Sequence, residues 1–292
     1  MRKLSLCGYG YYDRVGAEKS FSLLAETGFD AMDLSLYRGK EFRDFDLGGD
    51  GSIEKECGRI RALADRYGVE IGQTHAPFGY RDHDSDVEEI LETYRRSAIA
   101  TRTLGADKMV LHPIKFNDCV EGHRQQECYD LNLRVFERLA PILRECGVKG
   151  MLENMFLKVE RHGLPVLLPT IYSTAEELVR AADALGEDYG FCLDSGHALI
   201  TGEDLPQMAR AFGDRLGVLH LHDNDGTRDD HLPPYLGKLD FDALMLALKE
   251  IGYAGNLNFE IHFGYVPEDL LASQMRYVRD VGVRLRKLLD GE

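Results

Sequence analysis

Acidic and histidine side chains recur at the ends of short apolar runs along this 292-residue chain. In chain order these residues are His75, His112, Glu153, Asp194, His197, His220, His222, Glu260 and His262. Such side chains are unusual in the last positions of buried strands. Buried carboxylates that lie close together repel one another unless a cation or bound protons compensate their charge. The recurrence therefore predicts a site that holds a divalent cation.

The later runs supply a set of three carboxylates and one imidazole. Its members are Glu153, Asp194, His220 and Glu260. Oxygen-rich ligation with one nitrogen suits Mn²⁺, which we expect, and Co²⁺, Mg²⁺ and Zn²⁺ are alternatives. A lone histidine or glutamate at a strand end is more often a hydrogen-bonded rim residue. The repetition in successive runs is what favours a common site.

These side chains need a scaffold that brings the ends of several strands together. Eight short β-type runs alternate with amphipathic segments whose apolar residues recur every three or four positions. The runs cover residues 3–6, 31–34, 69–72, 108–111, 148–152, 189–193, 217–221 and 256–259. A glycine precedes many of the runs, as expected where a helix ends in a left-handed residue. These glycines are Gly28, Gly68, Gly105, Gly147, Gly186 and Gly252.

Eight strand–helix units in one chain predict a single (β/α)₈ barrel domain over residues 1–292. An open doubly wound sheet is disfavoured because residues 7–11 after the first run lack a glycine-rich phosphate loop. A barrel places all carboxyl ends of its strands on one rim, where we expect the active site. Long connections over residues 155–173 and 223–239 follow the fifth and seventh runs. In the first of them, Lys158 and Arg161 are interpreted as solvated, with a phosphate contact as the alternative.

Composition limits the classes of partner. The formal net charge is −15, which gives no support to a nucleic-acid or anionic-membrane partner. No apolar stretch is long enough to span a bilayer or to act as a signal peptide, so we expect a cytoplasmic protein. The six cysteines form no Cys-x-x-Cys pair, and we expect reduced, mostly buried thiols.

Four segments carry a resemblance to a known family. They are Leu152-Glu153-Asn154, Leu193-Asp194-Ser195-Gly196-His197, His220-Leu221-His222-Asp223 and Phe259-Glu260. The chain resembles the xylose-isomerase-like barrel superfamily, which contains ketose 3-epimerases, sugar-phosphate epimerases, inosose dehydratases and endonuclease IV. The resemblance implies Glu153, Asp194, His220 and Glu260 as metal ligands, with His222 as the second choice for the imidazole. It also implies His197 and Arg228 as substrate contacts.

The family likeness implies a reaction on a small carbohydrate. A divalent metal binds a substrate carbonyl and its neighbouring hydroxyl and stabilises an enediolate as a proton leaves the adjacent carbon. Glu153 and Glu260 are the two candidates for the base, and the sequence does not say which removes the proton. Further substrate contacts are expected from His75, His112 and His222 on the same rim. The identity of the sugar, its phosphorylation and any homo-oligomer stay open.

Two other enzyme classes compete with an epimerase or isomerase. The first is a metal-dependent dehydratase or lyase acting on a keto-sugar or inosose. The second is a tri-zinc abasic-site endonuclease, for which His75, His112, Asp229 and His231 would supply the additional ligands. Against the nuclease, the connection from His220 to Asp229 looks short, and no basic and aromatic loops suited to DNA stand out.

Overall fold

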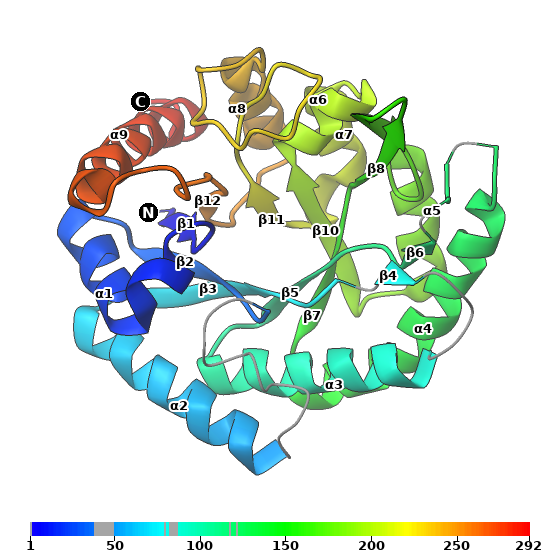
Figure 1. The fold of residues 1–292 in the computed structure, drawn as a ribbon, viewed down its shortest axis with the longest axis horizontal. Helices are drawn as coiled ribbons and strands as arrows, with labels where there is room; N and C mark the ends of the chain where they lie inside the picture. Colours follow the sequence, from blue (N-terminus) through cyan, green and yellow to red (C-terminus); the bar gives the residue numbers. More distant parts are fainter. Residues whose placement is uncertain (1, 38–49, 79, 82–86, 117, 121) are drawn as a thin grey trace.

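The computed structural model describes residues 2–37, 50–78, 80–81, 87–116, 118–120 and 122–292. Eight parallel strands form one sheet that curls into a barrel (Figure 1). They are β1 (Leu4–Cys7), β2 (Ala31–Ser35), β3 (Glu70–His75), β5 (Lys108–Leu111), β7 (Lys149–Glu153), β10 (Tyr189–Asp194), β11 (Leu216–His220) and β12 (Leu257–Phe259). Most of their residues are buried, as expected for strands covered on both faces.

Across the sheet the strands follow the order β11-β10-β7-β5-β3-β2-β1-β12. Barrel strands that are consecutive along the chain therefore lie side by side, and the first strand pairs with the last. The two ends of this sheet approach each other just past β11. There Leu221 forms a parallel bridge with Phe259, and its N–H donates to the carbonyl of Asn258. The barrel is therefore nearly closed, and the carboxyl ends of its strands share one rim.

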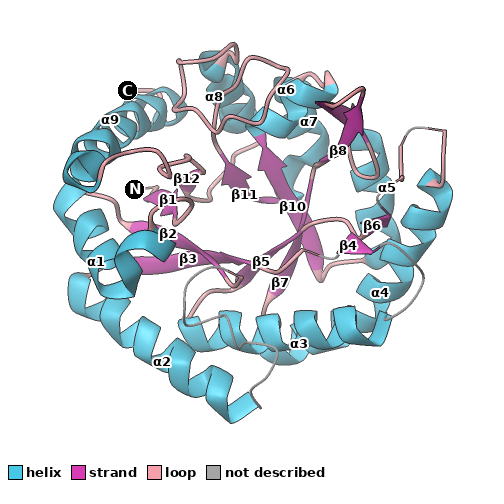
Figure 2. Cartoon of the chain, viewed as in Figure 1, coloured by secondary structure: helices cyan, strands magenta, loops and turns pink. Residues whose placement is uncertain are grey.

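Helices surround the barrel (Figure 2). They are α1 (Tyr12–Thr27), α2 (Asp50–Tyr67), α3 (Val87–Leu104), α4 (Gln125–Cys146), α5 (Ala175–Leu185), α6 (Ser195–Thr201), α7 (Leu205–Phe212), α8 (Phe241–Glu250) and α9 (Leu271–Asp290). In α4, for example, the buried residues Val135, Leu139 and Leu143 recur at four-residue intervals and face the barrel. Packing of this apolar stripe on the barrel stabilises the helix.

The structure confirms the predicted (β/α)₈ barrel. Each of the eight predicted β-type runs overlaps one barrel strand, and the fourth run coincides with β5. The six predicted helix-ending glycines all have positive φ, between +66° and +85°. All six cysteines are free and buried. Among the described residues, no helix is both long enough and apolar enough to cross a membrane.

Four short strands lie outside the predicted pattern. The connection over residues 155–173 contains an antiparallel hairpin, β8 (Phe156–Arg161) and β9 (Leu164–Pro169), where the sequence predicted a loop. A two-residue strand β4 (Tyr80–Arg81) pairs with β6 (Lys115–Phe116). Both pairs follow barrel strands and therefore stand on the rim at the mouth of the barrel. The two-residue strands β4 and β6 are too short to show a periodic pattern.

The turn after β1 generates a stability prediction. Gly10 has φ of +77°, and a Cβ there would lie 2.5 Å from the backbone N of Gly264. We expect Gly10→Ala to lower the free energy of unfolding by about 2 kcal/mol or more. In the control, Gly58→Ala within α2, the added Cβ meets nothing within 4 Å. It should raise the free energy of unfolding by about 0.5–1 kcal/mol. Urea denaturation measures both, and similar values for the two variants would contradict the account.

Candidate active site

Four strand ends bring the predicted metal-binding set together. Glu153, Asp194 and His220 are the last residues of β7, β10 and β11, and Glu260 directly follows β12. Their candidate ligand atoms all lie within 4.8 Å of one another. Three of these residues are fully buried and Glu260 is 9% exposed. The geometry therefore matches the convergence that the sequence predicted.

The imidazole of His220 is the centre of this set. Its Nδ1 lies 2.7 Å from Oε1 of Glu153 and 3.3 Å from Oε2 of Glu260. Oδ2 of Asp194 is 3.9 Å from the same nitrogen. Three carboxylates thus approach one nitrogen of the ring, and the candidate ligand atoms lie close enough together to share one ion.

The other nitrogen of His220 is held by Asp33, which sequence reasoning missed. Oδ2 of Asp33 lies 3.0 Å from Nε2 of His220 and also accepts from the side-chain amides of Gln73 and Asn258, at 2.9 and 3.1 Å. A carboxylate that accepts from Nε2–H fixes the tautomer and leaves Nδ1 as a lone-pair donor. Asp33 lies inside β2 and is fully buried. The sequence feature that could have identified Asp33 is a charged residue inside an otherwise apolar run.

A second group of possible ligands lies beside the first and shares Glu153 with it. Nε2 of His112 lies 2.7 Å from Oε2 of Glu153, and Nε2 of His75 lies 3.4 Å from the same oxygen. The two histidine nitrogens are 3.0 Å apart. These three residues also satisfy the distances of a metal-binding group.

A third group contains His197, His222, Asp229 and His231. Nε2 of His222 lies 2.9 Å from Oδ1 of Asp194, which links this group to the first. Nε2 of His231 lies 3.1 Å from Oδ2 of Asp229, and the His222 and His231 rings stack 4.0 Å apart. The loop that carries Asp229 and His231 is anchored by Asp223, which accepts from backbone N–H groups of that loop.

Burial and neighbouring charges set the protonation of the site. Burial alone would raise the pKa of Glu153, but the imidazoles of His220 and His112 outweigh it and hold that pKa well below its usual range. Burial lowers the pKa of His112 to about 3, so its ring is neutral at pH 7. Burial also opposes the charged form of His220, yet the surrounding anionic groups raise its pKa well above the ordinary value. The low pKa of Glu153 and the high pKa of His220 indicate that the centre of the set stabilises positive charge.

A cavity of about 310 Å³ opens above these groups. Its lining includes His75, His112, His197, Asp229, His231 and Glu260 from the site. Tyr9, Tyr37, Phe78 and Phe156 contribute aromatic walls, and Met155 and Leu157 add aliphatic surface. Two lysines, Lys115 and Lys158, also line it. The cavity is at the small end of the range for ligand pockets.

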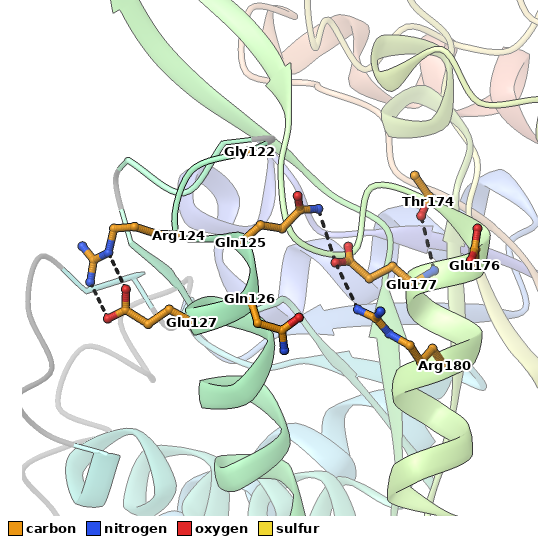
Figure 3. Close-up of a pocket in the computed structure, with 9 residues that line it drawn as sticks. All are labelled: Gly122, Arg124, Gln125, Gln126, Glu127, Thr174, Glu176, Glu177 and Arg180. Atoms are coloured by element: carbon orange, nitrogen blue, oxygen red, sulfur yellow. Dashed lines mark hydrogen bonds and ion pairs between the residues drawn. The ribbon is translucent and has the colours of Figure 1, made fainter.

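A second hollow, of about 530 Å³, lies between the starts of α4 and α5 (Figure 3). Its polar side chains are engaged with one another: Arg124 donates to Glu127, and Gln125 donates to Glu177. None of the predicted site residues lines it. The cavity lined by predicted site residues is therefore the smaller one, at the barrel mouth.

One predicted substrate contact lies elsewhere. The side chain of Arg228 is 71% exposed, and its guanidinium lies 3.2 Å from Asp230 and 3.6 Å from Asp225. Arg228 does not line the cavity at the barrel mouth. Of the other predicted substrate contacts, His75, His112 and His197 line the cavity, whereas His222 is fully buried and is not among its lining residues. The structure adds Asp33 beside His220 and Lys115 in the cavity wall. Lys115 was missed because the short strand β6 that places it has no sequence signature.

Known proteins share this fold and sequence pattern. A family model described as xylose isomerase-like TIM barrel matches residues 21–281. The uncharacterized protein MJ1311 of Methanocaldococcus jannaschii is 27% identical over 82% of this chain and 78% of its own length. The inosose isomerase of Bacillus subtilis is 25% identical over 63% of this chain and 64% of its own length.

Solved structures agree with the family match in fold. The IolI protein with a bound zinc atom has a TM-score of 0.76 at 18% identity and covers 99% of this chain and 98% of its own. A D-tagatose 3-epimerase-like protein has a TM-score of 0.75 at 22% identity, with the same coverages. Because the family model spans the barrel from α1 to α9, this chain belongs to the xylose isomerase-like TIM barrel family.

Proposed function

We propose that this protein is a divalent-cation-dependent epimerase or isomerase of a small carbohydrate. The observation that carries the proposal is the convergence of Glu153, Asp194, His220 and Glu260 beneath a monosaccharide-sized cavity. Structural neighbours described as sugar epimerases, and a curated relative described as an inosose isomerase, support the same reaction class. The neighbour with a bound zinc atom supports a divalent cation.

The donor set fits a hard or borderline divalent cation such as Mn²⁺. Three carboxylates and a neutral imidazole nitrogen are the ligands that such ions take. The high pKa of His220 indicates that protons otherwise supply the positive charge between these carboxylates. When bound, a cation would polarise a substrate carbonyl and the adjacent hydroxyl, and so stabilise the negative charge that develops as a proton leaves.

We assign the proton transfers to Glu260 and Glu153. Glu260 lines the cavity, so it can reach a substrate carbon directly. Glu153 is fully buried, with its Oε1 2.7 Å from Nδ1 of His220 and its Oε2 2.7 Å from Nε2 of His112. Two carboxylates fixed on different strands can remove a proton from one side of a carbon and return one to the other. Their rigid supports hold this geometry.

Other cavity residues would orient the substrate. His197 and His231 line the cavity and offer ring nitrogens to sugar hydroxyls, and His75 and His112 do so from the β3–β5 side. Burial lowers the pKa of His197, but the carboxylates of Asp194 and Asp229 raise it to about 10. His197 is therefore a cationic donor at neutral pH. The aromatic rings of Tyr9, Tyr37 and Phe156 can pack on the apolar face of a sugar and exclude water.

A second candidate function rests on the two additional ligand groups. The set of His75, His112 and Glu153 and the set that contains His197, Asp229 and His231 each satisfy metal-binding distances. Three adjacent cations would suit an endonuclease IV-like phosphodiester hydrolase. The net charge of −15 and the small cavity favour a small carbohydrate over DNA. A lyase on a keto-sugar or inosose would use the same first proton transfer.

The first prediction concerns the two glutamates. We expect the enzyme to incorporate solvent deuterium into a ketose substrate, measured by proton NMR. Glu153→Gln and Glu260→Gln should each lower the exchange rate by about a hundredfold or more, because each removes a base and a ligand charge. Glu250→Gln, at a surface ion pair with Arg210, is the control and should exchange normally. Normal exchange in either site variant would refute the assignment, and a dehydrated product would indicate the lyase.

The second prediction concerns the number of cations. Elemental analysis of the purified protein should give about one Mn²⁺-type ion per chain, and chelation should abolish deuterium exchange. About three zinc ions per chain, together with salt-dependent incision of abasic duplex DNA, would instead establish the nuclease. One ion per chain without incision would exclude it.

The third prediction concerns the support of His220. Asp33→Asn should weaken binding of a divalent cation by about 10–100-fold, because a neutral amide oxygen is a weaker acceptor for His220 Nε2–H than the carboxylate is. Asp30→Asn is the matched control, since Asp30 immediately precedes the same strand and its carboxylate accepts from the N–H of Leu4 at the far end of the barrel. Calorimetric titration measures both affinities. Equal affinities would show that Asp33 does not orient the ligand.

A further inference from the structure

We propose that Lys115 and Lys158 form an anion-binding subsite in the wall of the barrel-mouth cavity. The substrate would then be a small sugar that carries one carboxylate or phosphate group. This inference rests on the proposed function, because it takes the cavity to be the place where the sugar binds. It adds a substrate class that the metal-binding set does not specify.

Lys115 is a buried lysine in the cavity wall. It lies on β6, is 3% exposed, and lines the cavity beside Met155, Phe156 and Leu157. Its Nζ donates to the backbone carbonyl of Phe156 at 2.5 Å, which fixes the ammonium at the base of the hairpin. Burial lowers the pKa of Lys115 to about 7, so an anion bound in the cavity would favour the charged form of this side chain.

Lys158 provides a second cation on the same wall. It lies on β8 two residues after Phe156, so the two side chains leave the strand on the same face. Both residues line the cavity. No carboxylate among the described residues lies within ion-pair distance of Lys158 Nζ, and its side chain is solvent-exposed. Lys158, exposed on β8, and Lys115, buried on β6, thus line one cavity, and we take them to contact the same ligand group.

The acidic residues of the cavity are already engaged. Asp229 lies 3.1 Å from Nε2 of His231, and Glu260 lies 3.3 Å from Nδ1 of His220. Their charges are therefore balanced by imidazoles and by the cation site. An anion on the substrate could therefore form charge-assisted hydrogen bonds with the two lysines.

The cavity size restricts the ligand further. A volume of about 310 Å³ accommodates one monosaccharide with one small charged group, and it does not accommodate an oligosaccharide. Carboxylate and phosphate present the same oxygen chemistry to an ammonium group. The two sources are separated by experiment.

The test compares three sugars that differ only at C6. D-fructose, D-fructuronate and D-fructose 6-phosphate carry a hydroxyl, a carboxylate and a phosphate there. Binding to the metal-loaded full-length protein is measured by calorimetry, without any need for turnover. We expect at least one anionic sugar to bind about tenfold or more tighter than D-fructose. Whichever anion gains the larger factor identifies the group that the subsite takes.

Two variants test whether the preference for anionic sugars depends on these lysines. Lys115→Met and Lys158→Met keep the aliphatic stem and remove the charge, so each should reduce the preference for the anionic sugar severalfold or more. Lys55→Met on the outer helix α2 is the control and should keep the full preference. Lys158 is exposed, so its variant remains a test if Lys115→Met fails to fold.

Each outcome decides the proposal. Equal binding of neutral and anionic sugars, failure of both anionic sugars to bind at millimolar concentration, or an unchanged preference in both lysine variants would overturn it. Preferential anion binding without deuterium exchange would keep the subsite and reject the epimerase. Deuterium exchange on neutral ketoses with no anion preference would keep the epimerase and reject the subsite.

Discussion

Electrostatic repulsion between the carboxylates of Glu153, Asp194 and Glu260 is the constraint on which the barrel mouth depends. Their oxygens lie within a few ångströms of one another in a largely buried environment, where like charges interact strongly. Such an arrangement persists only if positive charge sits between them, as imidazolium or as a cation. A parallel barrel causes this repulsion because it places the last residue of every strand on one rim. The same arrangement creates a site for a cation.

The surrounding structure holds this charge cluster in place. Asp33, with Gln73 and Asn258, fixes the far side of His220, so the ring presents Nδ1 to the carboxylates. Asp223 ties down the long loop that brings Asp229 and His231 over the cavity. The β8–β9 hairpin supplies a wall that carries both aromatic surface and positive charge. The cluster is thus supported by hydrogen bonds from the barrel beneath it and from the loop above it, as a preorganised binding site requires.

The barrel and the ligand set were predictable from the sequence, because both depend on local pattern and topology. Apolar runs recur eight times, C-capping glycines recur six times, and polar residues end or follow the last six runs. Parallel strands then bring Glu153, Asp194, His220 and Glu260 together. Other features depend on how loops fold back, which local pattern does not encode. Arg228 follows the correct strand, yet its loop turns it toward Asp225 and Asp230 at the surface. Lys115 lies in a connection without a periodic pattern, and only the two-residue strand β6 places it in the cavity wall.

The most direct test of the account is X-ray diffraction from crystals of the purified protein, recorded at the absorption edge of its resident metal. An anomalous peak should lie between Glu153, Asp194, His220 and Glu260, at coordination distance of about 2.0–2.3 Å from an atom of each residue. A metal-loaded protein whose anomalous density lies away from these four side chains, or a protein that takes up no divalent cation, would contradict the central claim.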